Sequence, residues 1–315
     1  MKRESILKIL NHWKDPIFLR NTFIYKLVSL FYRKNKGSYI FDESWDNLII
    51  LDACRYDIFE ETYRNRSMRG TLKKKKSRGS HTISFLLENF KNGKYPEIIY
   101  ITANPHVDLL LKDKFYKIIS VWKEGWDNKE KTVLPKTMYE YGIDAIIKYP
   151  EKKLIFHFMQ PHFPYIGYKI GGGASEMLKN TVLHNQKIKL KKVCKDGLFS
   201  LYTLDLYAVL KRKDHLNIYK DNLNLVIPFI EDLINILPGK TIVTADHGES
   251  IGEFIHPLIP IRFYGHRENV RIPVLINVPW LVIEVKEKDP KRTNYLLERE
   301  KIFDSVEKLK SFRSI

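Results

Sequence analysis

Acidic and histidine side chains gather in a few short segments of this sequence, and their types indicate metal-assisted chemistry. Asp246 and His247 are adjacent and precede a glycine, and Asp52 ends another apolar run. A carboxylate beside a neutral imidazole suits a divalent transition metal such as zinc or manganese. A lone Asp-His pair is more often a hydrogen-bonded structural pair. A second buried carboxylate at Asp52, however, would be costly unless a cation or hydrogen bonds meet it.

Two further histidines are placed where they could join this group. His162 lies in Gln-Pro-His-Phe-Pro-Tyr, a loop made rigid by proline that follows an apolar run, and His266 follows Tyr264 and Gly265. His157 falls inside the apolar run, so we expect it in the core or behind the ligands. Because packing alone favours apolar atoms at such positions, we expect the acids and histidines to form a site.

Thr82 supplies a hydroxyl group. The segment from Gly79 to Thr82 reads as a glycine turn that leads into an apolar helix. The first turn of a helix carries unpaired backbone N–H groups and the positive end of the helix dipole, which favour a phosphate. An isolated threonine here is more often a plain N-cap. With a metal close by, the hydroxyl becomes an activated nucleophile.

The elements that must position these residues are buried strands that alternate with helices. Apolar runs cover 47–52, 98–102, 154–158 and 241–246, and apolar positions recur at helical spacing over 219–237. This pattern predicts an α/β fold with a mostly parallel central sheet flanked by helices. Ligands of such sheets bind beyond the carboxyl ends of the strands, where both Asp52 and Asp246 are expected.

The main domain is predicted to cover residues 41–290. Residues 1–40 are basic and aromatic, with apolar positions at helical spacing, which predicts an amphipathic helical segment. That segment either packs on the domain or lies on an anionic membrane. We expect a Lys-rich insertion near 168–215 and a charged C-terminal helix over 291–315. The charge run KKKKSR at 73–78 predicts a solvated loop, which could also steer an anion because it directly precedes the turn at Gly79.

Charge and composition limit the classes of partner. The chain of 315 residues has 54 Lys and Arg against 37 Asp and Glu, a formal net charge of +17. This excess favours anionic partners, but no stacking motif or recognition helix predicts a specific nucleic acid. Two cysteines exclude a disulfide framework and a cysteine-based zinc site. Because no apolar run is long enough to span a membrane and no secretory signal is evident, we expect a cytoplasmic protein, with peripheral contact to an anionic membrane as an addition.

Taken in order, the motifs resemble the alkaline phosphatase-like superfamily, which includes sulfatases, phosphodiesterases and phospho-headgroup transferases. Within it, the sequence looks like a group of archaeal and bacterial sulfatase-like proteins. The resemblance spans about residues 45–285 and rests on four segments: LDACRYD at 51–57, TANPH at 102–106, QPHFPY at 160–165 and DHGE at 246–249. It implies an alkaline phosphatase-like fold and a metal-dependent enzyme.

The resemblance also implies roles by position. It implies a metal shell formed by Asp52, Thr82, Asp246 and His247. Thr82 would be the nucleophile that is transiently esterified. His162 and His266 match positions that in different members bind a second metal, the substrate oxyanion or the leaving group. We expect one tight metal site, and a weaker second site would need a further acid. Arg55, at an expected helix start, is predicted to lie at the surface.

The surroundings of the cysteines argue against a sulfatase. Sulfatases need Cys or Ser in the pattern Cys/Ser-x-Pro/Ala-x-Arg, and Cys54, Cys194 and Ser80 stand in other contexts. An unmodified Thr82 favours phosphoryl chemistry instead. We therefore predict a metal-dependent hydrolase or transferase of phosphate mono- or diesters, acting through a phospho-threonine intermediate on an anionic, lipid- or glycan-linked phosphate. The alternatives are a sulfate-ester hydrolase and a non-catalytic, anion-binding protein at a membrane surface.

Overall fold

A computed structural model describes residues 35–66, 68–168, 179–180, 182–183, 213–256, 259–266, 268 and 270–284. Three segments predicted from the sequence fall largely or wholly outside these residues: the N-terminal helical segment, the Lys-rich insertion and the C-terminal charged helix. The described residues include every residue predicted for the site.

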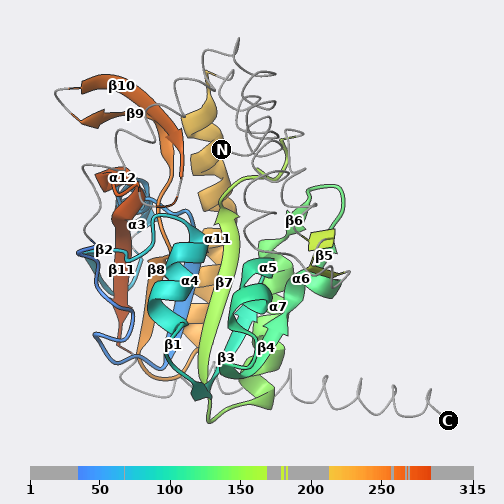
Figure 1. Cartoon of the computed structure of the whole chain (residues 1–315). Coiled ribbons are helices and arrows are strands. Elements are labelled where there is room, and N and C mark those ends of the chain that lie inside the picture. The colour runs from blue at the N-terminus through green and yellow to red at the C-terminus, as the bar shows by residue number, and fades with distance from the viewer. Residues whose placement is uncertain are drawn as a thin grey trace, which may run out of the picture.

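A seven-stranded sheet forms the centre of the fold, in the order β2-β11-β8-β1-β7-β3-β4 (Figure 1). Neighbouring strands from β8 to β4 run parallel, whereas β11 is antiparallel to both β8 and β2. The predicted α/β fold with a mostly parallel sheet is therefore confirmed. The strands are β1 (Asn47–Asp52), β2 (Thr71–Lys76), β3 (Tyr95–Thr102), β4 (Phe115–Ser120), β7 (Lys153–Pro161), β8 (Thr241–Ala245) and β11 (Asn277–Ile283).

Helices cover both faces of the sheet and bury two apolar cores. The larger core lies under α3 (Tyr56–Arg66), α6 (Val121–Glu124), α7 (Pro135–Lys148) and α11 (His215–Ile236), and the smaller under α4 (Thr82–Phe90) and α5 (Pro105–Leu111). In β1, Ile49 and Leu51 belong to the larger core and Leu48 and Ile50 to the smaller. Successive side chains of a strand point to opposite faces, so strands covered on both sides are apolar throughout.

The smaller elements lie around this sheet. The strands β5 (Trp126–Asp127) and β6 (Thr132–Val133) pair with each other, and α12 (Pro273–Ile276) leads into β11. The strands β9 (Ser250–His256) and β10 (Ile259–Gly265) form an antiparallel pair at the upper left of Figure 1. This pair follows β8 in the chain and lies at the carboxyl end of that strand.

The predicted solvated loop at 73–78 is wrong for its lysines, which lie in the edge strand β2. Lys75 Nζ is 2.5 Å from Glu43 Oε1 and 3.7 Å from the ring centroid of Trp280. On the other face, Lys74 Nζ is 4.5 Å from the ring centroid of Tyr56. Lysine suits an edge strand because its alkyl chain covers aromatic rings while its ammonium group stays in water.

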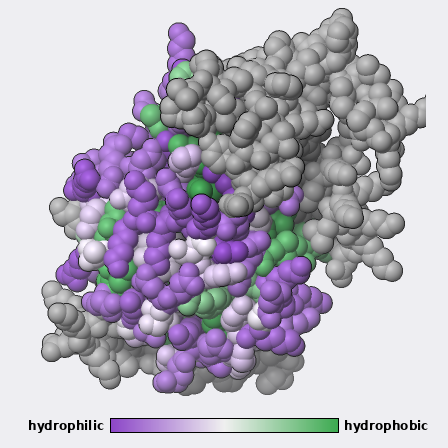
Figure 2. Space-filling model, turned by 60° about the vertical axis from the view of Figure 1, so that its left-hand side comes forward, coloured by the Kyte–Doolittle hydropathy of each residue, from purple (hydrophilic) through white to green (hydrophobic). Residues whose placement is uncertain are grey.

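The described surface in Figure 2 is mostly hydrophilic, with apolar residues in small, scattered groups. None of the described helices combines the length and the apolar character that a membrane crossing requires.

Candidate metal and catalytic site

Asp52, Asp246 and His247 meet at the carboxyl ends of two neighbouring strands. Strand β1 ends at Asp52, and Asp246 and His247 follow the last residue of β8 directly. One ligand atom from each lies within 4.8 Å of the other two. All three side chains are buried. The structure thus brings together the three residues that the sequence predicts as protein ligands from strand ends.

Hydrogen bonds orient both carboxylates. Oδ2 of Asp52 accepts a hydrogen bond from Nδ2 of Asn104 at 2.8 Å. Oδ1 of Asp246 accepts from the backbone N–H groups of Ala53 at 3.0 Å and His247 at 2.8 Å. Oδ2 of Asp246, in contrast, is buried and has no hydrogen-bond partner among the described residues. An unpartnered buried carboxylate oxygen is costly, so this atom fits a cation.

The imidazole of His247 is oriented as a metal ligand. Its Nδ1 lies 2.8 Å from the carbonyl oxygen of Gly248, so Nδ1 carries the proton and Nε2 presents its lone pair. Nε2 lies 3.6 Å from Oδ1 of Asp52 and 3.4 Å from Oδ2 of Asp246. Two carboxylates and a neutral imidazole in this arrangement fit zinc or manganese.

The electrostatics of this cluster favour a bound cation. Burial, and then repulsion from Asp246, raise the pKa of Asp52 well above its usual value. Burial, and then the neighbouring His266, lower the pKa of His247 to about 3. His247 is therefore neutral at pH 7, the form that binds metal, whereas a cation would favour the ionised form of Asp52.

Thr82 is the first residue of α4, and its hydroxyl reaches this group. Its Oγ1 lies 3.5 Å from Oδ1 of Asp52 and 3.3 Å from Nε2 of His247. The N-cap is His81, so Thr82 is not the plain N-cap of the helix. Gly79 allows the turn to approach α4, because a Cβ at Gly79 would lie 2.5 Å from Cβ of Phe85.

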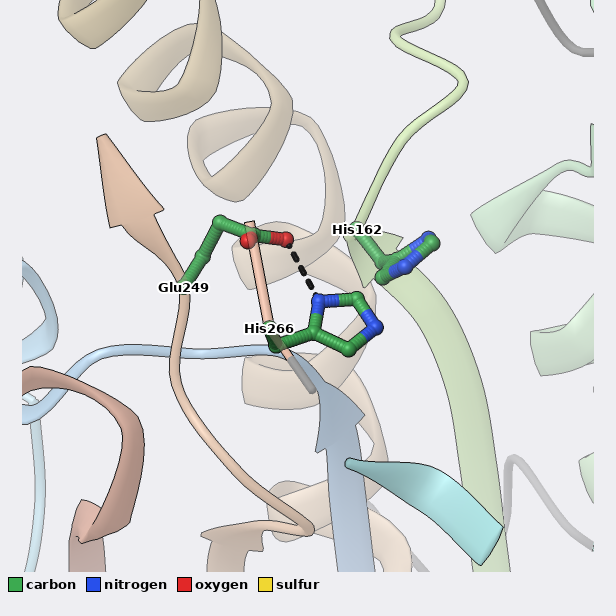
Figure 3. Close-up of side chains that lie close together, drawn as sticks. All are labelled: His162, Glu249 and His266. Carbon is green, nitrogen blue, oxygen red and sulfur yellow. Dashed lines mark hydrogen bonds and ion pairs between the residues drawn. The ribbon is translucent and has the colours of Figure 1, made fainter. Parts of the chain in front are cut away.

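A second group of ligand-type residues consists of His162, Glu249 and His266 (Figure 3). Nδ1 of His266 lies 3.0 Å from Oε2 of Glu249, and Oε1 of Glu249 is buried without a partner in the described part of the chain. Nδ1 of His162 bonds the carbonyl oxygen of Phe163. Burial, and then His266, lower the pKa of His162 to about 4. This group also has the composition of a metal site.

The two groups are neighbours. The ring centroids of His247 and His266 lie 4.3 Å apart, and those of His162 and His266 lie 5.1 Å apart. The hydroxyl of Thr82 is therefore close to the first group, and the ring of His247, which it approaches, lies next to His266 of the second group.

The predicted surface position of Arg55 is wrong, because its side chain is only 7% exposed. Its Nε and Nη2 donate to the carboxylate of Asp57 at 3.0 and 2.6 Å, and its Nη1 bonds Oε1 of Glu253. Burial alone would lower the pKa of Arg55. The two carboxylates have the larger combined effect, so its pKa lies above the usual value. Arg55 thereby ties the start of α3 to β9, one strand that carries the second group.

Two residues of the site were not singled out from the sequence. Glu249 joins His162 and His266, and Asn104 holds Asp52. Glu249 stands in the Asp-His-Gly-Glu segment, which was the available signal. Asn104 stands in TANPH and is also the N-cap of α5, with its Oδ1 accepting from the backbone N–H of His106 at 3.0 Å.

Comparisons with known proteins give likenesses of structure only. Neither a protein-family model nor a curated protein sequence matches the chain. The soluble domain of lipooligosaccharide phosphoethanolamine transferase A from Neisseria meningitidis is similar, with 14% identity, a TM-score of 0.49 and coverage of 79% of both chains. The zinc complex of the C-terminal periplasmic domain of EcEptC from Escherichia coli has 15% identity, a TM-score of 0.42 and coverage of 80% of this chain and 76% of that one.

A protein of the alkaline phosphatase superfamily from Vibrio parahaemolyticus is similar as well, with 11% identity and a TM-score of 0.41. It is matched over 78% of this chain and 61% of that one. These likenesses are of fold alone, and one of the similar proteins is named for the superfamily that the sequence motifs resemble. What the chain does must be argued from its own residues.

The expectation of a cytoplasmic protein is corrected by these likenesses. One of the similar structures is a periplasmic domain, and another is the soluble domain of a transferase named for lipooligosaccharide. A cytoplasmic location is therefore not supported. Absence of a secretory signal was the basis of that expectation, and it is too weak an observation to place a protein.

Proposed function

We propose that this protein is a metal-dependent transferase or hydrolase of phosphate esters in which Thr82 is the nucleophile. The observation that carries the proposal is the position of its Oγ1, within 3.5 Å of both Asp52 and His247, in the first turn of α4. A hydroxyl placed beside a ligand cluster and in the first turn of a helix, at the positive end of the helix dipole, suits attack on a bound phosphate.

Different residues of the chain have different roles in this reaction. A divalent metal held by Asp52, Asp246 and His247 would lower the pKa of the adjacent hydroxyl and screen charge on the phosphate. Thr82 Oγ1 gives its proton to a water molecule and forms a bond to phosphorus, while the bond from phosphorus to the oxygen of the leaving alcohol breaks in line. The N-terminal turn of α4 offers N–H groups to the phosphate oxygens. Water or an acceptor hydroxyl then attacks the phospho-threonine and releases Thr82.

The second group serves the leaving alcohol in this proposal. Nδ1 of His266 donates to Glu249, so when the imidazole is protonated on both nitrogens Nε2 delivers its proton to the departing oxygen and the ring is left neutral. His162 lies at the end of β7 beside that ring. The same three residues could instead hold a second, weaker metal ion. The number of zinc ions bound distinguishes the two arrangements.

The test compares Thr82→Ala with the wild-type chain after loading with zinc or manganese. Turnover of phosphate mono- and diesters should fall by a factor on the order of 1,000 or more, because the nucleophile is absent. Metal content should be unchanged, since the three ligand residues remain. Rapid acid quenching followed by peptide mass spectrometry should find phosphate on Thr82 of the wild type.

A matched control is Thr62→Ala, which removes the hydroxyl of a buried threonine of α3 that bonds the carbonyl oxygen of Ile58. It should retain turnover. Full turnover in Thr82→Ala would overturn the nucleophile assignment. An absence of any turnover and of phospho-threonine in the metal-loaded wild type would favour the non-catalytic, anion-binding alternative.

Sulfate-ester hydrolysis is not favoured by any feature of the site. The residue beside the ligand cluster is a threonine, whereas Cys54 is buried in the larger core. Burial, and then the charge of Asp57, raise the pKa of the Cys54 thiol well above its usual value. A protonated thiol enclosed by apolar residues is not an accessible precursor of formylglycine.

A further inference from the structure

Arg271 is a buried cation for which the described residues offer no acceptor. It is 9% exposed, and no hydrogen bond or ion pair joins its guanidinium to any residue that the structure describes. Arginine is not deprotonated in proteins, so an unpaired buried guanidinium is costly. The guanidinium of Arg55 is also buried, but its charge is neutralised by ion pairs with Asp57 and Glu253.

The chain around Arg271 is tied to the candidate site from two sides. Arg271 stands just before α12, and the backbone N–H of Gly248 donates to the carbonyl oxygen of Leu275 in that helix at 2.7 Å. The N–H of Ser77 donates to the carbonyl oxygen of Ile276, also at 2.7 Å. This segment therefore lies between the ligand loop that follows β8 and the turn that leads into α4.

The surroundings of Arg271 carry an excess of positive charge. Glu88 is the carboxylate that acts on it, but Glu88 already accepts hydrogen bonds from Arg78 at 3.1 and 2.7 Å. Burial lowers the pKa of Arg271, Glu88 opposes this effect and Arg78 adds to it. Arg271 also acts on His81, whose pKa is lowered by burial first, then by His247, and last by Arg271 among the nearby charges.

We propose that Arg271, with the N-terminal turn of α4, forms a binding site for an oxyanion of the substrate beside the phosphorus that Thr82 attacks. His81, on which Arg271 acts, is the N-cap of α4. A guanidinium presents paired N–H groups that match the two oxygens of a phosphate or carboxylate, and the helix dipole adds to the attraction. The substrate class is then a phosphate ester that carries a second phosphate or a carboxylate.

The assignment of this oxyanion to a substrate rests on the proposed function, whereas oxyanion binding by Arg271 can be tested without turnover. The experiment measures the thermal unfolding of the full chain at constant ionic strength, with and without inorganic phosphate. It is run on zinc-loaded and on chelator-treated protein, so that phosphate bound near the metal ligands is recognised. Phosphate should raise the midpoint of the wild type in both forms.

Arg271→Met should weaken phosphate binding in the chelator-treated chain by a factor on the order of 10 to 100. Without phosphate, this variant should unfold at the same temperature as the wild type or higher, because an apolar side chain of similar length removes a buried charge. Arg271→Lys keeps the charge but not the paired N–H groups, so its phosphate affinity should fall between those of the wild type and Arg271→Met. Arg64→Met removes an exposed charge, 71% exposed, and should respond to phosphate like the wild type.

Two results would overturn the inference. One is an undiminished phosphate response in Arg271→Met. The other is a lower midpoint of this variant without phosphate, because that would show that the guanidinium already has its partner within the fold. Phosphate binding that depends on Arg271, in a protein that turns over no phosphate ester, would contradict the proposed function while leaving the oxyanion site standing.

Discussion

Nε2 of His157 lies 3.9 Å from Oδ2 of Asp246, and both atoms are buried without a hydrogen-bond partner among the described residues. The hydroxyl of Tyr100 is 2.9 Å from Nδ1 of His157. With this hydroxyl as the donor, Nδ1 accepts, and the proton of the neutral imidazole is on Nε2, which faces Asp246. A donor and an acceptor thus face each other just beyond hydrogen-bond distance, which indicates that His157 orients Asp246 from behind.

His157→Gln should lower the affinity for zinc about 10- to 100-fold, because Asp246 loses the group that orients it. Tyr100→Phe should change the affinity in the same direction by a smaller factor. Competition with a chromophoric chelator measures both. Tyr149→Phe removes a hydroxyl that bonds Lys117 on the surface, and should have no effect. An unchanged affinity in His157→Gln would mean that this histidine only fills the core.

Asp246→Asn should abolish tight metal binding without unfolding the chain. The side-chain oxygen of asparagine can still accept from the N–H groups of Ala53 and His247, while an NH2 group replaces the oxygen that fits the cation. Elemental analysis should find about one tightly bound zinc or manganese per wild-type chain and none in the variant. Equal metal content in two well-folded proteins would show that the cluster is structural.

Glu249→Gln distinguishes a second metal site from a proton-donating pair. If His162, Glu249 and His266 hold an ion, the wild type should bind about two zinc ions per chain at high zinc and the variant about one. Isothermal titration gives both numbers, and Glu60→Gln on α3 is a control at a half-buried carboxylate outside the two ligand groups. If the wild type and Glu249→Gln each bind one zinc ion per chain, and the variant loses turnover, the group acts in proton transfer.

Metal binding should release protons from carboxyl groups and not from histidines. The pKa values of Asp52 and Glu249 are raised, chiefly by burial, while those of His247 and His162 are lowered to about 3 and about 4. A raised pKa means that protons compete with the metal until the pH exceeds it. Zinc affinity should therefore increase with pH until the carboxyl groups of Asp52 and Glu249 are ionised without the metal.

Calorimetry in buffers of different ionisation enthalpy counts these protons. Zinc binding to the wild type should release protons, because the pKa of Asp52 is raised above its usual value. Asp52→Asn, which cannot release a proton from this position, should release fewer. A release that is unchanged in this variant would mean that another group supplies the proton.

The strand-end part of the site could be predicted from sequence for a simple physical reason. A buried parallel strand is apolar on both faces, so an acid at its end stands out, as Asp52 and Asp246 do after β1 and β8. Thr82 could be predicted because the glycine turn before it marks the start of a helix. These positions depend on local pattern and on the shared edge of the sheet.

The remaining features depend on contacts between distant segments. Glu249 is recognisable as a ligand only when β9 and β10 pair and bring it to His266. Asn104 reads as a helix cap, and its bond to Asp52 exists only because β1 and β3 both flank β7. The lysines of β2 read as a loop, because no local pattern shows the aromatic rings that their alkyl chains cover.

The pairing of β9 with β10 has a consequence for how the second group can change. Ser250 pairs with Gly265, so Glu249 and His266 are neighbours across the open end of this strand pair. Their spacing is therefore set by backbone ladder geometry, and residues added or removed between the strands leave it intact. A slip of one residue in register would turn their side chains to opposite faces. Variation in loop length is compatible with this half of the site, whereas a shift in strand alignment is not.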